Sequence, residues 1–366
     1  LDAIKRSNIS TTRLVSLIAR LKEYTHTTRT DILVGLPGES FDSHLQSLDK
    51  ALSYGVNDIL GGEVQLLPGS EMNTRESRDK FGLGTKYRFF EGASGIYKGE
   101  TIFELQEVIR ETNDMSETEM IRLRALRALF FGGLTLGDLR PLVPYLTNKG
   151  VRLTDLLKNV ILQGSDHPVL CETFEWLGKQ ISAEWFETVE EADLFLRDPQ
   201  NISNFFSDKM FTKLNFAFTA YLLLHPKQYE AYYQQIEKEV LLLLPNEPKS
   251  IIREIVKLCR DQNFLYRCLN GDNSSSVSLK LSKDTIRVLK KCGYLNLNYI
   301  DSFSLDLILD MVTADRVLDK LSSKNGQLSI FDLTQIMQSY RGRLHMTPRY
   351  RGRLNMEILE SAHAVR

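Results

Sequence analysis

The sequence is short of cysteine, and the few cysteines it has are scattered. None of them has the CxxC or CxxxCxxC spacing of thiolate ligands, so no metal or iron–sulfur motif is expected within this chain. Such sparse thiols predict buried, reduced side chains in the cytoplasm in place of a disulfide framework. The four positions are Cys171, Cys259, Cys268 and Cys292.

Net charge and long apolar runs are also missing. The 366 residues hold 46 Lys plus Arg against 47 Asp plus Glu, a net charge of −1 that argues against a general nucleic-acid or membrane-surface binder. No apolar run reaches the roughly 20 residues that span a bilayer, so no transmembrane helix is expected. The 42% of hydrophobic residues predicts a globular chain with ample core.

The first part of the chain has an α/β pattern. Residues 30–34 form a short apolar run that ends in a Gly-Leu-Pro-Gly turn, and Ser40 then caps a helix over residues 41–52. Residues 56–67 predict a second strand, which a Pro-Gly pair ends. Alternating strands and helices with short turns are typical of parallel βα units, whose ligands bind at the carboxyl ends of the strands. Both turns are expected at that edge.

The remainder predicts mostly helix. A polar, Gly-rich stretch over residues 82–99 leads into successive amphipathic segments, and Ser116 with Glu119 forms a capping box before one of them. A brief strand is expected at residues 277–281. We divide the chain at residues 1–135, 136–270 and 271–366: an α/β unit with its helical trailer, a helical domain, and a helical or mixed extension.

The turn Gly35-Leu36-Pro37-Gly38-Glu39-Ser40 can seat an anion or a nucleotide. Its glycines let the backbone approach a ligand, and the helix that follows offers N–H groups. It lacks the lysine of a P-loop and the spacing of a Rossmann fingerprint, so a purely structural corner remains an equal alternative. The similar turn over residues 65–72 favours a shared ligand edge.

Three segments in this order resemble a known family: LDAIKRSNIS, TDILVGLPGESFDSHLQSLDKALSYGVNDI and QLLPGSEM. They look like the carboxyl-terminal half of the barrel of a radical S-adenosylmethionine (radical SAM) enzyme, of the subgroup with a cobalamin-binding domain. A segment like residues 85–88 and a helix like residues 112–116 follow in that subgroup. The resemblance covers roughly the first third of the chain, and nothing after about Phe130 resembles a known family.

The resemblance implies a fold and a chemistry. The fold is the carboxyl-terminal half of a partial TIM-like α/β barrel, followed by a mostly α-helical domain. In the family, a 4Fe-4S cluster on a CxxxCxxC loop binds S-adenosylmethionine and cleaves it to a 5′-deoxyadenosyl radical. A cobalamin-dependent methyltransferase is one reaction of this kind. A small-molecule or peptide substrate and a reductant protein are the implied partners, with no nucleic acid or membrane.

The resemblance also implies site residues. Arg6 would pair with the carboxylate of S-adenosylmethionine, a bidentate task that suits a guanidinium. The adenine side of the pocket would be lined by Gly35, Leu36, Pro37, Gly38 and Glu39, and the adenine would pack on Leu66, Leu67 and Pro68. No residue of this chain is expected to bind a metal.

The sequence departs from the family pattern because it contains neither the CxxxCxxC loop nor a cobalamin-binding domain. Two interpretations follow. The chain is a truncated or split product of a complete enzyme, which its start without Met and in the middle of a motif favours. Alternatively, the half barrel is a vestige, and the helical region is a non-catalytic module that binds a protein partner.

Two histidines, one strand face and a repeat near the end of the sequence give further expectations. His26 and His44 lie beside the predicted turns, and we expect them to be exposed rather than to contact substrate. Strand alternation places Glu63, Gln65 and Leu67 on one face, where Glu63 is a candidate for a substrate pocket. The near-repeat YRGRLHM and YRGRLNM at residues 340–346 and 350–356 favours a local duplication over a nucleic-acid site.

Overall fold

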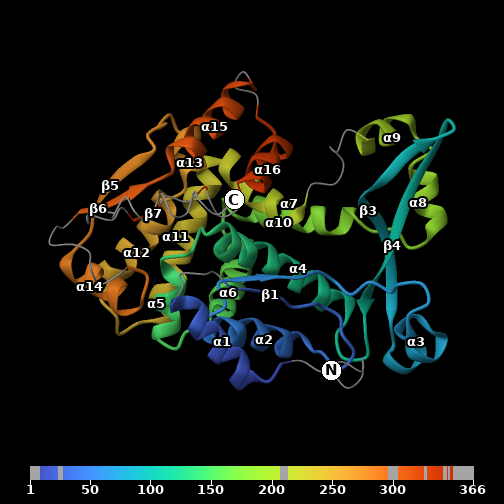
Figure 1. Ribbon diagram of the computed structural model, residues 1–366, viewed down its shortest axis with the longest axis horizontal. Coiled ribbons are helices and arrows are strands. Elements are labelled where there is room, and N and C mark those ends of the chain that lie inside the picture. Colours follow the sequence, from blue (N-terminus) through green and yellow to red (C-terminus); the bar gives the residue numbers. More distant parts are fainter. Residues whose placement is uncertain are drawn as a thin grey trace.

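The computed structural model shows a predominantly helical α/β molecule, with three small sheets among the residues that it describes (Figure 1). The hairpin β3–β4 and the carboxyl-terminal sheet β5–β6–β7 lie toward opposite ends of its long axis, with the helices between them. The structure describes residues 9–23, 28–206, 213–295, 304–324, 328–340, 344 and 347–348.

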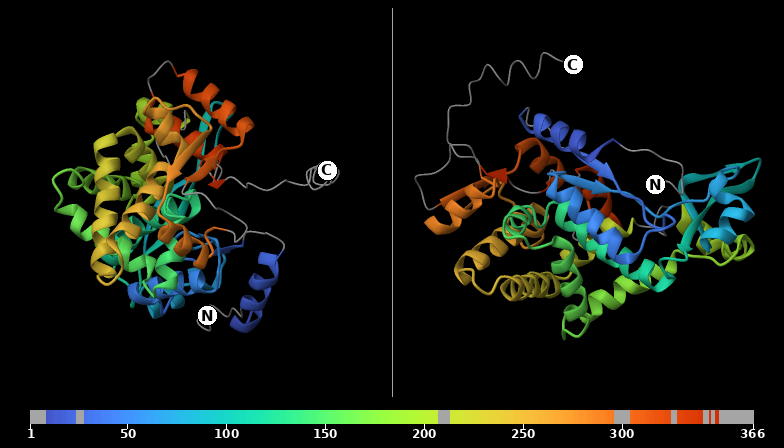
Figure 2. Two further views of the ribbon diagram at one scale, coloured as in Figure 1. Left: turned by 90° about the vertical axis from the view of Figure 1, so that its left-hand side faces the viewer. Right: turned by 90° about the horizontal axis from the view of Figure 1, so that it is seen from below.

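One parallel βαβ unit begins the described chain after helix α1 (Thr11–Glu23). Strands β1 (Arg29–Asp31) and β2 (Asp58–Leu60) pair in parallel, and the pairing continues as a bridge between Val34 and Glu63. Between them, α2 (Phe41–Ser53) begins at the predicted Ser40 cap, where Ser40 and Ser43 exchange hydrogen bonds. The views of Figure 2 show α1 at the periphery of the molecule.

A long antiparallel hairpin follows where the sequence predicted a polar, glycine-rich stretch leading into helix. Strands β3 (Gly84–Tyr97) and β4 (Glu100–Glu111) are joined at Lys98 and Gly99, which both have positive φ, as a tight primed turn requires. The prediction was wrong because Gly95 lies within the strand rather than in a loop, just beyond a bulge between Phe89 and Ser94.

The predicted half barrel reaches only as far as this single βαβ unit. After β2 the chain turns so that Leu66 and Val64 bond to β4, with the Leu66 amide donating to Glu107 at 2.9 Å. That neighbour runs antiparallel, as the Gln65–Val108 bridge shows. Among the described residues, parallel pairing is therefore confined to β1 and β2 with their bridge, and no barrel closes.

Helices make up most of the remainder, as predicted. Residues 112–116, expected as helix, instead form the turn before α4, in which Thr112 and Met115 pair and Ser116 and Glu119 form the predicted capping box. The elements are η2 (Glu71–Asn73), α3 (Arg75–Phe81), α4 (Glu117–Phe131), η3 (Gly132–Leu136), α5 (Leu142–Asn148), α6 (Leu153–Ser165), α7 (Cys171–Ala183), α8 (Val189–Phe195), α9 (Pro199–Phe206), α10 (Leu214–Leu224), α11 (Pro226–Leu243), α12 (Lys249–Asp261), α13 (Phe264–Leu269), β5 (Ser276–Lys280), α14 (Lys283–Lys291), β6 (Ser304–Ile308), α15 (Met311–Ser322), α16 (Ile330–Ser339) and β7 (Thr347–Pro348).

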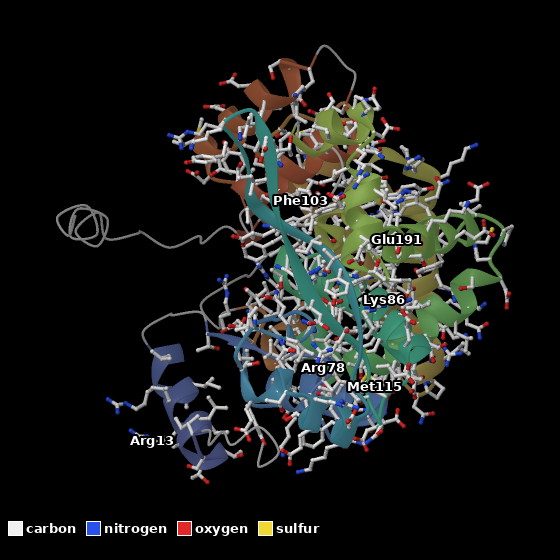
Figure 3. The ribbon with its side chains drawn as sticks, turned by 90° about the vertical axis from the view of Figure 1, so that its right-hand side faces the viewer. Arg13, Arg78, Lys86, Phe103, Met115 and Glu191 are labelled. Carbon is white, nitrogen blue, oxygen red and sulfur yellow. The ribbon has the colours of Figure 1, made fainter. Side chains whose placement is uncertain are left out.

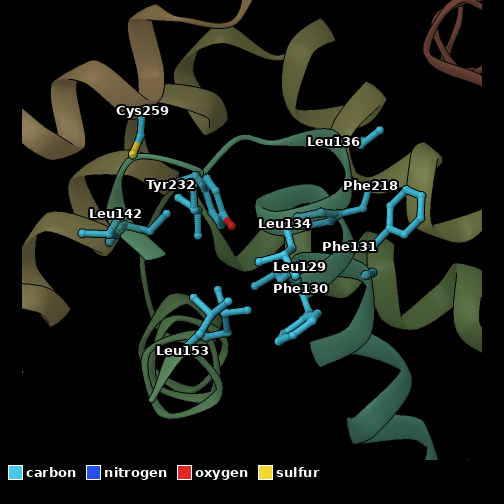
Figure 4. Packing of buried hydrophobic residues seen from close by; sticks show 14 of the residues in the cluster. Leu129, Phe130, Phe131, Leu134, Leu136, Leu142, Leu153, Phe218, Tyr232 and Cys259 are labelled. Atoms are coloured by element: carbon cyan, nitrogen blue, oxygen red, sulfur yellow. The ribbon is translucent and has the colours of Figure 1, made fainter. Parts of the chain in front are cut away.

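One contiguous apolar core joins the βαβ unit to the helices. Helix α4 contacts α6, α7 and α10, and its buried Leu129, Phe130 and Phe131 lie at the centre of the packing in Figure 4. The predicted boundary after residue 135 falls inside η3, every residue of which is buried. The division into three domains remains a prediction.

The carboxyl-terminal part of the chain contains more strand than the sequence predicted. The strand predicted at residues 277–281 is β5, one residue earlier, and β6 is a further strand that the sequence did not predict. All four cysteines are free, and only Cys259 is fully buried, where burial raises the pKa of its thiol. In the described part of the chain, no helix has the length and apolarity needed to cross a membrane.

Candidate functional site

The Gly35–Ser40 turn follows β1, and the backbone N–H groups of its two glycines are hydrogen-bonded within the protein. The Gly35 amide donates to Glu39 Oε2 at 3.1 Å, and the Gly38 amide donates to Asp114 Oδ2 at 3.0 Å. Both glycines have positive φ, which explains why glycine stands at each position. The amides of both glycines in the predicted ligand turn are therefore occupied by carboxylates of the protein itself.

His44 reinforces this closure, and the expectation that it is exposed was wrong. Its side chain is fully buried beneath the turn, and Nδ1 lies 2.9 Å from Glu39 Oε1. Because a carboxylate only accepts, Nδ1 carries the proton in this contact. Glu39 thus bridges the Gly35 amide and the imidazole. His26, like Arg6, lies outside the described residues.

The second turn presents its two leucines to different surroundings. Leu66 is buried in the core, whereas Leu67 is 60% exposed. The Asn73 amide closes the turn by donating to the carbonyls of Leu66 and Leu67, at 3.4 and 3.2 Å. Since this turn and the first both follow the paired segments of a parallel unit, they lie at the same edge of the sheet. The roles expected of Leu66, Leu67 and Pro68 remain predictions.

A cluster of buried ion pairs lies beside β2, centred on Glu63. Arg124 of α4 binds the carboxylates of Glu63 and Glu184 with its two terminal nitrogens. Arg88 of β3 approaches the same two carboxylates more loosely, with Nη1 3.5 Å from Glu63 and 3.6 Å from Glu184. Four charged side chains from four separate segments are thereby brought together, so only the tertiary fold creates the cluster.

Trp185 packs against three guanidiniums of this region. The Cζ atoms of Arg110, Arg88 and Arg124 lie 4.1, 5.1 and 5.7 Å from its ring centroid. Arg110 is only 2% exposed, and its Nε and Nη1 make no hydrogen bond within the part of the chain that the structure describes. Its nearest carboxylate, Glu117, is 3.7 Å from Nε and also binds Lys86. Figure 3 views this side of the molecule and labels Lys86 on the hairpin.

Electrostatics in the cluster follow from burial and proximity. Burial disfavours the ionised form of Glu63, but the guanidiniums of Arg124 and Arg88 outweigh it and hold the pKa of this carboxyl well below its usual range. Burial also opposes the charge of Arg124, whose pKa the two carboxylates nevertheless raise. For Arg110 and Arg127 burial prevails and lowers the pKa. Guanidiniums remain charged at neutral pH despite such shifts.

The ion pairs border a cavity of about 680 Å³. It lies between β2, strands β3 and β4, helix α4 and the start of α10, and it is partly open to solvent. Gln106 lines it beside Arg88, and Arg127 donates to the Gly61 carbonyl at 2.5 Å in its wall. Apolar walls come from five phenylalanines: Phe89, Phe90, Phe130, Phe131 and Phe216. The cavity therefore combines guanidiniums with aromatic surface, which suits an organic ligand.

Sequence reasoning named Glu63 but missed its partners. Glu63 does line the cavity, whereas Gln65 is exposed and makes no part of it. Arg124 lies 61 residues away along the chain, so no local pattern links the pair. One signal was present: Arg124 and Arg127 lie three residues apart on α4, on the face that also buries Met120 and Leu123.

The chain provides no ligand set for an iron–sulfur cluster. Its cysteines occur singly, and no group of three His, Cys, Asp or Glu side chains within the described residues is arranged to hold a metal ion. The described residues therefore do not fit a resident cluster. No protein-family model matches the chain, and no curated protein matches it significantly.

Proposed function

We propose that the chain is part of a radical SAM enzyme, with the iron–sulfur cluster held outside these 366 residues. The observation that supports the proposal is the β1–α2–β2 unit, which carries both Gly-Pro turns of the resemblance at one edge of a parallel pair. In such a protein the cofactor would supply a 5′-deoxyadenosyl radical, and cobalamin-dependent methylation is a candidate reaction. The reducing cytoplasm is the expected location.

In this proposal the chain's own residues bind S-adenosylmethionine and the substrate and exclude water from the substrate. Leu67 is the exposed apolar side chain at the turn edge, available to pack on an adenine ring. The cavity between β2, β3 and α4 would receive the substrate and exclude water from it, since aromatic side chains form much of its wall. Arg6 would pair with the carboxylate of S-adenosylmethionine.

A second candidate function is a non-catalytic interaction module. The observation that favours it is the closure of the first turn, where Glu39 and Asp114 occupy the amides of Gly35 and Gly38. A ligand that used these amides would first have to displace two carboxylates. In that case the turn is a structural corner and the helical region binds a protein partner.

The test uses the protein encoded by the natural reading frame that contains these residues. This protein is reconstituted anaerobically with iron, sulfide and reductant, and the 5′-deoxyadenosine that it forms is assayed. The variant Leu67→Asp should lower S-adenosylmethionine cleavage at least tenfold without unfolding the protein, because Leu67 is exposed. Arg6→Ala should do the same. Leu162→Asp, on an equally exposed leucine of α6, is the matched control and should retain cleavage.

The two candidates predict opposite results. Cleavage that falls in Leu67→Asp and Arg6→Ala but not in Leu162→Asp supports the enzyme. A protein that holds no iron and cleaves no S-adenosylmethionine contradicts it and leaves the interaction module as the better account.

A further inference from the structure

The cavity beside β2 carries more positive charge than its own carboxylates balance. Its lining holds four cationic side chains, Arg88, Arg124, Arg127 and Lys213, against the three carboxylates of Asp31, Glu63 and Glu184. Arg110 lies outside this lining, where Glu117 is 3.7 Å from its Nε and shares Lys86 with Glu187. One positive charge therefore remains in excess around a partly open cavity.

An excess of buried cations is costly without a counter-ion. Removing a charged group from water is unfavourable unless a partner of opposite charge replaces the solvent. Burial lowers the pKa of Arg110 and of Arg127, which is the signature of that cost. A chain under no functional constraint would avoid it with an apolar side chain at either position.

Donors for an anion remain on the arginines that line the cavity. Arg88 makes one hydrogen bond, from Nε to Gln106 Oε1 at 3.1 Å, and its distances to the two carboxylates are those of loose ion pairs. Arg127 makes one hydrogen bond, to the Gly61 carbonyl, among the described residues. Each fork thus keeps N–H groups that no protein acceptor in the described chain takes.

The rest of the lining defines the body of the ligand. Phe90 borders the cavity and is 41% exposed, and Phe131 and Phe216, which also line it, pack edge to face with their ring centroids 4.9 Å apart. An exposed aromatic ring beside guanidiniums offers a surface on which a planar or apolar group can pack. A small inorganic anion would leave this surface in water.

We propose that the cavity binds an organic anion, a carboxylate or phosphate attached to an apolar or aromatic body, with Arg88 and Arg127 as the residues that hold the acidic group. The inference deepens the proposed function by naming the class of substrate, and it rests on that function only in calling the ligand a substrate. Binding itself requires neither S-adenosylmethionine nor iron.

The experiment measures binding by isothermal titration calorimetry to the 366-residue chain, with three probes of similar shape: phenyl phosphate, benzoate and neutral benzyl alcohol. We expect at least one of the two anions to bind at least tenfold more tightly than benzyl alcohol, and the tighter of the two identifies the acidic group. Arg88→Gln should weaken that binding at least tenfold. Arg122→Gln is the matched control, since Arg122 is exposed on the same helix as Arg124 and Arg127.

A second variant separates binding from folding. Glu184→Gln removes a carboxylate that competes with the ligand for Arg124 and Arg88, so anion affinity should rise several-fold even if the protein becomes less stable. A damaged fold would weaken binding in both variants, whereas the inference requires opposite changes. Circular dichroism at the titration temperature shows which variants are folded.

The inference is overturned if the anions bind no more tightly than benzyl alcohol, or if Glu184→Gln weakens anion binding while folded. Because these titrations contain no cofactor, their failure would leave the 5′-deoxyadenosine assay unaffected. Conversely, anion binding in a protein that cleaves no S-adenosylmethionine would contradict the proposed function and retain the site.

Discussion

The two polar regions of the α/β part differ in how their charges are balanced. At the Gly35–Ser40 turn, two carboxylates saturate two glycine amides, and a buried imidazole completes the network. In the cavity beside β2, four cationic side chains face three carboxylates, and the neighbouring Arg110 retains two nitrogens without a hydrogen bond among the described residues. The first region pairs its glycine amides within the protein, although His44 Nε2 makes no hydrogen bond to a described residue, whereas the second keeps an unbalanced positive charge.

The difference teaches that a glycine-rich turn does not by itself identify a binding site. Its geometry makes amides available, but the neighbouring side chains decide what fills them. A surplus of buried charge is a stronger indication of a ligand, because the protein has no internal partner that removes the cost.

The largest effect is expected from Glu63→Gln. This carboxylate, with 9% of its side chain exposed, pairs with Arg124 and faces Arg88. Removing its charge leaves the arginines with a single neighbouring carboxylate, so the free energy of unfolding should fall by about 3–5 kcal/mol. Urea unfolding at pH 7 measures the loss. A change below about 1 kcal/mol would show that the cationic surplus costs little, and the comparison would fail.

The pH dependence of the same pair has a definite sign. Because the folded-state pKa of Glu63 is depressed, its stabilisation is complete above the unfolded pKa of about 4.3 and is lost as the pH falls through the lower folded value. The difference in unfolding free energy between wild type and Glu63→Gln should therefore stay constant from pH 7 to about 4.5 and narrow below that. Narrowing above pH 6 would mean that Glu63 is not held ionised.

The starts of two helices could be predicted from the sequence because their capping signals are local. The Ser40 and Ser116 caps fixed the starts of α2 and α4 correctly, since a cap depends on residues three apart. The hairpin was missed because glycines such as Gly95 indicated a loop, although Gly95 pairs with Ile102 within the hairpin. The pairs of the cavity could not be predicted, because Arg124 lies about sixty residues from each of its two carboxylates.

The glycines of the first turn offer a matched pair of substitutions. Gly35 and Gly38 have φ of +90° and +81°, but a Cβ at Gly35 would meet Met120 Cε at 3.1 Å, whereas nothing lies within 4 Å at Gly38. Alanine strains the backbone at either position, so each variant should lower the free energy of unfolding by about 1–3 kcal/mol. The loss should be larger for Gly35→Ala. Thermal unfolding compares them. Equal losses would show that the packing beneath the turn yields without cost.

A smaller effect is expected from Glu39→Gln, which removes charge from the network of the closed turn. Hydrogen bonds to a charged acceptor are stronger than neutral ones, so the variant should lose about 1 kcal/mol. Its effect on the affinity for phenyl phosphate or benzoate should be smaller than that of Glu184→Gln, because Glu39 is the weakest of the charges that act on Arg127. An effect on anion affinity as large as that of Glu184→Gln would show that the two regions are strongly coupled.

The smallest effect on stability, and the most informative one for the turn edge, is expected from Leu67→Asp. With 60% of its surface already in water, Leu67 contributes little to the core, so the free energy of unfolding should change by less than about 0.5 kcal/mol. An exposed leucine at the carboxyl edge of a parallel pair is then explained either by a ligand or by nothing in the fold. Lost S-adenosylmethionine cleavage at full stability would show that the closed turn still borders a binding edge, with apolar contact in place of backbone donors. Retained cleavage by an active parent protein would remove this edge from the site and leave the cavity beside β2 as the region of this chain that meets a ligand.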